Sequence, residues 1–439
     1  MIAALRGLVG RRTVRATLTN SAVNACVLCL NLGTGLLTAR FLGPEGRGAY
    51  AAMVIWPQFL ASLFTLGLQQ AVPYNLVRRP EERAAITAAA LLLGLGAGSA
   101  AALIGSALVP RWLDHYGPEI VAMARVILWL APVVLLIWIC NACMQAAGRF
   151  DLFNRAQYLQ PVLSLMGLLV LVATDMLTPV SAALTSVAGA LPVLALGLAW
   201  LWREHRPAFV RPLGESLRLL RYGLRSCGVQ LVNALSQQFD NVFVLGALSP
   251  ATVGLYMVAR NAARPSQFFA SAMNAVLFPR ASALTDQAAL ELSGLAARVG
   301  ILAALAVALP LGLLGPWLIT TIYGADFAAA ASPFQILVAE AAVAAISSTM
   351  AQAFLSVGRP GVITILQVAS FLVGAAMIVV LVPRLGMQGA ALGLLAGSLV
   401  RLIVIAACYP VVLRVTVPRL WLNGADLRRL LAPHRMVAA

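Results

Sequence analysis

The sequence predicts an all-α polytopic membrane protein with about twelve transmembrane helices in two six-helix, pseudo-symmetric lobes. Three observations lead to this prediction. First, 61% of the 439 residues are hydrophobic and only 10% are charged, whereas soluble domains carry about 25% charged residues. Second, apolar windows of about 20 residues, long enough to cross a bilayer, recur along the chain. Third, a short motif occurs twice, about half the chain apart.

The repeated motif reads LGPEGRGAY in residues 42–50 and LSPATVGLY in residues 248–256. A shift of 206 residues therefore aligns the following residues: Leu42, Pro44, Gly48 and Tyr50 with Leu248, Pro250, Gly254 and Tyr256. Two weaker repeats follow in the same order, residues 148–149 against 358–359 and residues 182–184 against 390–392, at shifts of 210 and 208. This pattern predicts a duplicated unit of roughly 200 residues, which in a membrane protein is typical of transporters.

The predicted spans follow the apolar windows. They lie at residues 17–39, 50–73, 85–109, 123–147, 157–175, 180–202, 226–248, 253–278, 298–322, 333–356, 361–382 and 389–413. They divide the chain into an N-terminal lobe (1–202), a cytoplasmic linker with an interfacial helix (203–225), a C-terminal lobe (226–413) and a cytoplasmic amphipathic tail (414–439). In the linker and the tail, leucines and arginines occupy opposite helical faces, so we expect both segments to lie on anionic membrane lipids.

The arginines set the predicted orientation. The chain has 31 arginines and no lysine; 23 arginines lie on one side of the predicted spans, five lie on the other side and three lie within spans. Because positively charged loops stay in the cytoplasm, both termini are predicted to be cytoplasmic. With six spans in each half, the two halves have the same orientation, so the repeats are parallel and related by an axis along the membrane normal.

Several classes of function are disfavoured. The formal net charge of +16 does not indicate nucleic-acid binding, because the arginines are spread over the loops. There is no G-x-x-x-x-G-K-[ST] loop and no Ser/His/Asp set at a shared depth. The C-x-x-C pairs Cys26/Cys29 and Cys140/Cys143 lie in apolar runs without further metal ligands, so we expect four buried, small hydrophobic side chains. The sequence therefore predicts no enzyme, no metal and no cofactor.

The eighth predicted span carries one polar face. Arg260, Arg264, Gln267, Ser271 and Asn274 recur at positions i, i+4, i+7, i+11 and i+14. A charge at the bilayer centre costs about 2.5–3.5 kcal/mol on insertion scales, so such residues usually face a cavity or a partner. We therefore expect a cavity wall whose two cations bind an anion. The alternative is that both arginines extend to the membrane interface.

Two carboxylates lie within predicted spans. Asp240 continues a polar face of the seventh span that includes Gln237, and it is expected either to bind a coupling cation or proton or to pair with Arg260 at the same depth. Glu340 in the tenth span is expected either to carry a proton or to form a salt bridge with Arg401 of the twelfth span.

Isolated amides also lie within spans. Asn24 and Asn31 fall broadly on one face of the first span. Hydrogen bonding between helices is the default role of such amides. Their repetition on one face favours a cavity lining.

Several motifs together carry a resemblance to a known family. The run ARFLGPEGRGAY at residues 39–50 resembles the stretch after the first span of bacterial Wzx-type polysaccharide (O-antigen) flippases. Asp240 ahead of VGLYMVA at 253–259, the Gly358-Arg359 turn and LGMQGAA at 385–391 resemble the same family. These flippases belong to the multidrug/oligosaccharidyl-lipid/polysaccharide exporter superfamily, together with lipid II flippases and the multidrug and toxic-compound (MATE) antiporters.

The resemblance implies a function. An oligosaccharide on a polyprenyl diphosphate would move from the cytoplasmic to the outer leaflet of the bacterial inner membrane, through a central cavity that opens alternately to each side. Coupling to H⁺ or Na⁺ and contact with other polysaccharide-assembly proteins are implied as well. Arg260 and Arg264 are then the candidates for binding the diphosphate. The amides of the cavity would bind sugar hydroxyls: Asn24, Asn31, Gln237, Gln267 and Asn274.

Three alternatives remain. Twelve spans leave no extra helix pair of the kind that lipid II flippases have, which disfavours that activity. A cation-coupled multidrug antiporter would favour an acidic or aromatic cavity, in contrast to the arginines of the eighth span. A polytopic glycan polymerase or glycosyltransferase would need a long outer loop with paired carboxylates, and Asp114 and Glu119 are the only close pair predicted outside.

Overall fold

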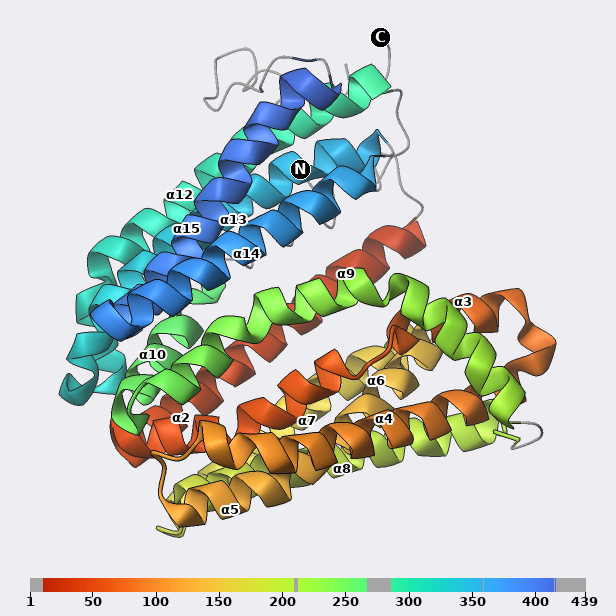
Figure 1. Ribbon diagram of the computed structural model, residues 1–439, viewed down its shortest axis with the longest axis horizontal. Coiled ribbons are helices and arrows are strands. Elements are labelled where there is room, and N and C mark those ends of the chain that lie inside the picture. Colours follow the sequence, from red (N-terminus) through yellow and green to blue (C-terminus); the bar gives the residue numbers. More distant parts are fainter. Residues whose placement is uncertain (1–10, 209–211, 267–285, 358, 414, 416–439) are drawn as a thin grey trace. The chain divides into compact units, whose positions relative to one another are not determined.

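The computed structural model describes residues 11–208, 212–266, 286–357, 359–413 and 415. These residues are almost entirely helical and include no strand (Figure 1). The α-helices are α2 (Arg11–Leu63), α3 (Leu68–Arg78), α4 (Arg83–Trp112), α5 (Pro118–Ile127), α6 (Ala131–Ala146), α7 (Phe150–Ala173), α8 (Pro179–Glu204), α9 (Pro212–Ala247), α10 (Pro250–Ala263), α12 (Asp286–Tyr323), α13 (Ala331–Ser356), α14 (Pro360–Leu385) and α15 (Met387–Cys408).

Within the described part of the chain, nine helical stretches are long and apolar enough to cross a membrane. The predicted all-α polytopic membrane fold is thereby confirmed. Ten of the twelve predicted spans overlap these nine stretches, because the first two share the stretch Ala22–Leu63. The second span was predicted to continue to residue 73, but α2 ends at Leu63 and α3 begins at Leu68. The seventh predicted span lies in α9, whose amides and Asp240 lower its hydropathy. The eighth begins in α10 and continues outside the described residues.

The helix α2 contains a sharp break at Gly43, where the loop between the first two spans was expected at about residues 40–49. Gly43 alone has non-helical angles, with φ 67° and ψ −179°. Glycine is suited to positive φ because it has no Cβ, and Pro44 then starts the next helical segment, where its missing N–H costs nothing. The connection is therefore a single residue and not a loop.

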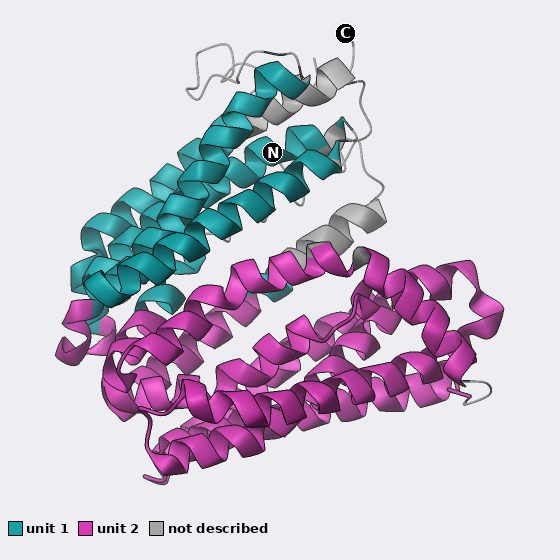
Figure 2. Ribbon diagram, viewed as in Figure 1, with its two compact units in different colours: residues 1–25, 259–321, 330–439 teal, residues 26–258, 322–329 magenta. Residues whose placement is uncertain are grey.

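The chain forms two compact units (Figure 2). One comprises residues 26–258 and 322–329, and the other comprises residues 1–25, 259–321 and 330–439. The predicted lobe boundaries at 202 and 226 stay a prediction. The structure joins the second half of the predicted linker to the seventh span in one continuous helix, α9, which bends partway along (Figure 1).

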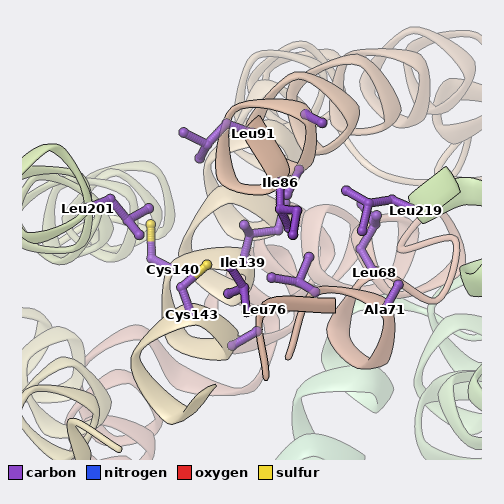
Figure 3. Close-up of a cluster of buried hydrophobic side chains, with 14 of the residues drawn as sticks. Leu68, Ala71, Leu76, Ile86, Leu91, Ile139, Cys140, Cys143, Leu201 and Leu219 are labelled. Carbon is purple, nitrogen blue, oxygen red and sulfur yellow. The ribbon is translucent and has the colours of Figure 1, made fainter. Parts of the chain in front are cut away.

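The first part of α9 packs on α3 and α4. Leu219 is fully buried in a cluster with Leu68, Leu76 and Ile86 (Figure 3). Tyr222 stacks on Tyr74 of α3 with 4.3 Å between ring centroids. This part of α9 is therefore held by protein contacts, while leucines on its other side are exposed: Leu213, Leu217 and Leu224.

Ion pairs at the end of α3 complete this docking. The guanidinium of Arg79 donates to Glu82 at 2.6 Å, to Glu215 of α9 at 3.0 Å and to Asn75 at 2.7 Å. Arg218 donates to the second oxygen of Glu215 at 2.8 Å. Because Glu215 is only partly exposed and both of its oxygens are bonded, this network is more ordered than an isolated surface pair.

The same cluster shows what the cysteines do. Cys140 and Cys143 are free thiols buried among the apolar side chains of α4, α6 and α8, as predicted (Figure 3). Cys26 and Cys29 are exposed, so the expectation of burial was wrong for that pair. They lie on the first part of α2, where few side chains are buried.

Replacing Gly67 by alanine is expected to loosen the docking of α9. Gly67 has φ +71°, and a Cβ there would lie 2.2 Å from the carbonyl oxygen of Gly223. The left-handed conformation alone costs a residue with a side chain about 1–2 kcal/mol, so the thermal unfolding midpoint of the purified protein should fall. Gly96→Ala is the matched control, because nothing lies within 4 Å of its added Cβ. Equal midpoints for the two variants would contradict this role.

His205, directly after α8, is expected to make stability pH-dependent. Its Nδ1 lies 3.0 Å from the hydroxyl of Thr87, and burial, followed by the charge of Arg83, holds the pKa of His205 below its usual 6.5. The unfolded chain then takes up the proton more readily, so stability is lost as the pH falls from 6.5 towards the lowered pKa and is constant above. His205→Gln should flatten the unfolding midpoint measured between about pH 5 and 7; an unchanged slope would exclude His205 as the cause.

In the other unit, α13, α14 and α15 pack closely. Gly389 and Gly393 of α15 lie against the backbone of α14, where added Cβ atoms would come within 2.4 Å of the carbonyl oxygen of Leu381 and 2.8 Å of the backbone nitrogen of Ile378. Such small residues let membrane helices approach each other. An apolar cluster closes the far end of these helices, where Tyr409 donates to the carbonyl oxygen of Met350 at 3.0 Å.

Candidate functional site

The arginines of the eighth predicted span lie at the end of α10. Arg260 is in the last turn of α10 and is half-buried, while Arg264 follows one residue after the helix and is exposed. Gln267 and Asn274, which were predicted to continue this face, lie outside the described residues. The two cations therefore lie at the end of a short helix and directly after it, and both their shared face and the cavity wall stay predictions.

Asp240 is fully buried on α9. The hydroxyl of Tyr256, on α10, donates to its Oδ2 at 2.6 Å. The sequence analysis considered Arg260 as a partner and missed Tyr256. The sequence could have indicated this partner. Asp240 and Tyr256 each lie eight residues from Leu248 in the turn between the helices, and so they reach the same depth in the membrane.

Glu340 and Arg401 lie in the same unit, on α13 and α15. The hydroxyl of Ser398 donates to Oε1 of Glu340 at 2.7 Å, and Glu340 acts electrostatically on Arg401, one turn further along α15. The structure therefore brings Glu340 close to the arginine predicted as its partner. Ser398, which the sequence analysis missed, completes a polar contact between two otherwise apolar helices. Whether Glu340 also carries a proton stays a prediction.

The amides proposed to bind sugar are distributed over both units. Asn24 is exposed on α2 and belongs to one unit, whereas Asn31, half-buried on α2, and Gln237, exposed on α9, belong to the other. Their side chains are accessible to a ligand, because none of the three is fully buried. A common lining formed by these residues stays a prediction.

Arg47 is a further residue that the sequence analysis placed elsewhere. It was assigned to an outer loop, but it lies on α2 after the Gly43 break and is only 6% exposed. Its guanidinium carbon lies 5.0 Å from the centroid of the Tyr50 ring, and its Nε has no hydrogen-bond partner among the described residues. The cation is therefore held by an aromatic face, an interaction worth about 0.5–2 kcal/mol.

Potential metal ligands are not clustered in the described part of the chain. No group of three or more His, Cys, Asp or Glu side chains there is arranged to hold a metal ion. The polar groups just described are instead arginines, which donate hydrogen bonds, amides, which donate and accept, and single carboxylates, which accept.

Comparison with known proteins identifies the family of the chain. Residues 37–332, about two thirds of the chain, match the model of a family described as "Polysaccharide biosynthesis protein". No curated protein matches the sequence.

Solved structures share the fold. An inward-facing multidrug resistance MATE family transporter of the MOP superfamily superimposes with a TM-score of 0.72 at 19% identity, over 86% of this chain and 92% of that one. The lipid II flippase MurJ, in an inward closed conformation, gives a TM-score of 0.76 at 12% identity, over 94% and 90%. A MOP superfamily transporter from Pyrococcus furiosus, whose binding pocket is described as having reverse polarity, gives 0.61 at 19% identity, over 89% and 93%. The fold expected from the resemblance is confirmed.

Proposed function

Because the chain belongs to the polysaccharide biosynthesis protein family, we propose that it flips a polyprenyl-diphosphate-linked oligosaccharide from the cytoplasmic to the outer leaflet of the bacterial inner membrane. The family match is the observation that carries the proposal. The protein is a multi-pass membrane transporter and not a catalyst in this proposal, and both termini lie in the cytoplasm.

The charge of the candidate residues supports an anionic substrate. Arg260 lies in the last turn of α10 and Arg264 directly after the helix, so the two positive charges are separated by only four residues of the chain. Guanidinium binds diphosphate oxygens in a bidentate manner, with charge-assisted hydrogen bonds. In the proposed cycle these two residues receive the diphosphate, and the amides bind sugar hydroxyls.

Movement through the membrane needs a source of free energy, and the buried carboxylates are the proposed coupling groups. Asp240 is fully buried, and Glu340 is half-buried beside Ser398 and Arg401. A carboxylate within a membrane span is expensive and usually marks an ion or proton pathway. We propose that H⁺ or Na⁺ binding at one of them drives alternation between states open to either side.

Deletion of the gene tests the proposed substrate. The mutant should accumulate the lipid-linked oligosaccharide on the inner leaflet and lose surface glycan, and the wild-type gene should restore both. Surface glycan made at the normal level in the deletion strain would overturn the proposal.

A second candidate function, multidrug export, is favoured by the fold shared with the MATE transporter. The same deletion strain separates the two functions. Increased sensitivity to cationic drugs with normal surface glycan would support export. Loss of glycan with unchanged drug sensitivity would support the flippase.

A further inference from the structure

Arg47 is a buried cation without a carboxylate partner. The residue is 6% exposed, and its Nε has no hydrogen-bond partner among the described residues. The groups that act on it electrostatically are two tyrosines, Tyr50 and Tyr323, which carry no charge at neutral pH. Glu45, the acid nearest in the sequence, is exposed, and a spacing of two residues puts side chains on different sides of a helix. The described part of the chain therefore does not balance the charge of Arg47.

The groups around Arg47 can each donate a hydrogen bond. The ring of Tyr50 lies against the guanidinium, and the hydroxyl of Tyr50 lies 2.9 Å from that of Ser186 on α8. Tyr323, at the end of α12, is buried. These four residues belong to one compact unit. A guanidinium with three hydroxyls and no carboxylate is a set of groups that suits an anion, because each member can donate to it.

The second copy of the repeated motif shows that this helical turn does not need a cation. The shift of 206 residues aligns Arg47 with Val253 and Tyr50 with Tyr256. Val253 is fully buried, and Tyr256 donates to Asp240 at 2.6 Å. The same turn is thus built once around a buried apolar side chain and once around a buried charge. Packing alone does not explain Arg47, so the charge itself needs another role.

Binding of an anion would compensate for the burial of Arg47. Burial removes the hydration of a charge, and an aromatic face replaces only part of it. Charge-assisted hydrogen bonds to an anion replace much more. Tyr50 and Ser186 are half-buried, so an ion can reach the guanidinium from their side. Arg47 also lies four residues after the Gly43 break, about 6 Å along the helix, and is therefore close to one surface of the membrane.

We propose that the guanidinium of Arg47 and the three neighbouring hydroxyls bind a phosphate-type oxyanion. The planar guanidinium donates to two oxygens of such an anion at once, and the hydroxyls donate to its other oxygens. The anion is either free phosphate or the phosphate of a lipid headgroup at the membrane surface. The site is separate from Arg260 and Arg264, which belong to the other compact unit. It does not depend on the identity of the transported substrate.

Binding of radioactive orthophosphate tests the site in the purified protein, in dodecyl maltoside, a detergent without phosphate. The Arg260→Gln/Arg264→Gln variant should still bind phosphate, and adding Arg47→Val should weaken that binding by about a hundredfold. Valine is the residue of the second copy at this position, so the turn should fold. Arg111→Val, which removes an exposed arginine of the same unit, is the matched control. An affinity that Arg47→Val leaves unchanged, or no phosphate binding before it is added, would overturn the proposal.

Two milder variants give a test that does not depend on the folding of Arg47→Val. Arg47→Lys keeps the charge but loses the geometry for two oxygens, so its affinity for phosphate should lie between those of wild type and Arg47→Val. Tyr323→Phe keeps the ring and removes one donor, and it should weaken binding by about tenfold. Wild-type affinity in both variants, or displacement of phosphate by an equal concentration of chloride, would contradict an oxyanion site.

A lipid bilayer identifies the source of the anion. The same measurement is repeated in nanodiscs of phosphatidylcholine, whose headgroups carry phosphate but no net charge. If a headgroup is the natural ligand, lipid occupies the site and the affinity for orthophosphate falls relative to detergent. If free phosphate is the ligand, the affinity is the same in both. Either result supports binding at Arg47, provided that Arg47→Val weakens binding in detergent.

The binding tests are independent of the proposed transport function, because they use the purified protein and make no reference to glycan. If Arg47→Val loses phosphate but the deletion strain makes normal glycan, the anion site is supported and the proposed substrate is wrong. If the deletion strain loses glycan but Arg47→Val binds phosphate like wild type, the substrate is supported and the anion site is wrong.

Discussion

Replacing Arg260 and Arg264 together by glutamine is expected to abolish transport while leaving the amount of protein in the membrane unchanged. Hydrogen bonds to charged groups contribute about 1.5–3 kcal/mol each, so loss of both guanidiniums should weaken diphosphate binding by about a hundredfold or more. The measurement is complementation of the deletion strain, with surface glycan and accumulated lipid-linked oligosaccharide as readouts. Both residues lie near the end of α10 and neither is fully buried, which is why folding should survive.

Two further variants make this result specific. Arg260→Lys/Arg264→Lys keeps both charges but loses bidentate geometry, so it should retain part of the transport. A double glutamine variant of Arg203 and Arg384, both exposed, removes the same charge elsewhere and should behave as wild type. If the Arg260/Arg264 protein disappeared from the membrane, the arginines would have a packing role. If it transported normally, they would not bind the substrate.

Asp240→Ala is expected to destabilise the protein, whereas Asp240→Asn is expected to fold and fail in transport. The alanine variant leaves the fully buried Tyr256 hydroxyl without its 2.6 Å acceptor, at a cost of about 1.5–3 kcal/mol. Asparagine keeps an acceptor oxygen but removes the charge that a cation or proton needs. Thermal unfolding of the purified protein measures the first effect, and complementation measures the second.

Tyr256→Phe is the matched variant for this pair. It removes the same hydrogen bond from the other side while keeping the ring and the Asp240 charge. We expect it to lower the unfolding midpoint and to retain more transport than Asp240→Asn. Normal transport by Asp240→Asn would show that the carboxylate is structural, and the coupling role would then pass to Glu340.

Most of the fold was predictable because a bilayer demands long apolar helices, and the sequence shows them directly. The exceptions have local causes. The apolar windows gave no sign that the first two spans meet at one residue, since the break depends on the positive φ of Gly43 followed by Pro44. The position of α9 in the chain predicted a span, but its polar face keeps its hydropathy too low for it to be counted among the nine apolar stretches. The docking of α9 on α3 required a ring stack and ion pairs between distant segments.

The candidate site was predictable as a set of residue types and only partly as a set of contacts. Periodicity predicted one helical face for Arg260 and Arg264, but α10 ends one residue before Arg264. The charge requirement of a carboxylate within a span led to Arg401 as a neighbour of Glu340. Side-chain partners such as Tyr256 and Ser398 carry no charge and were missed. Arg47 was missed because an arginine in a presumed loop gives no signal of burial.

The docked first part of α9 and the part that carries Asp240 belong to one continuous helix, so the docking sets how the second part is rotated about the helix axis. The second part follows directly after the helical turns held by Leu219, Tyr222 and Glu215, and no loop lies between the two parts that could absorb a change in length. Each residue inserted into an α-helix turns everything beyond it by about 100°. One added residue between Arg225 and Gln230 would therefore turn the carbonyl oxygen of Val242 away from the indole N–H of Trp112 on α4, which donates to it at 2.9 Å, and seven would restore the alignment to within about 20°. The number of residues between Arg225 and Gln230 is thus as constrained as the identity of the residues that they position.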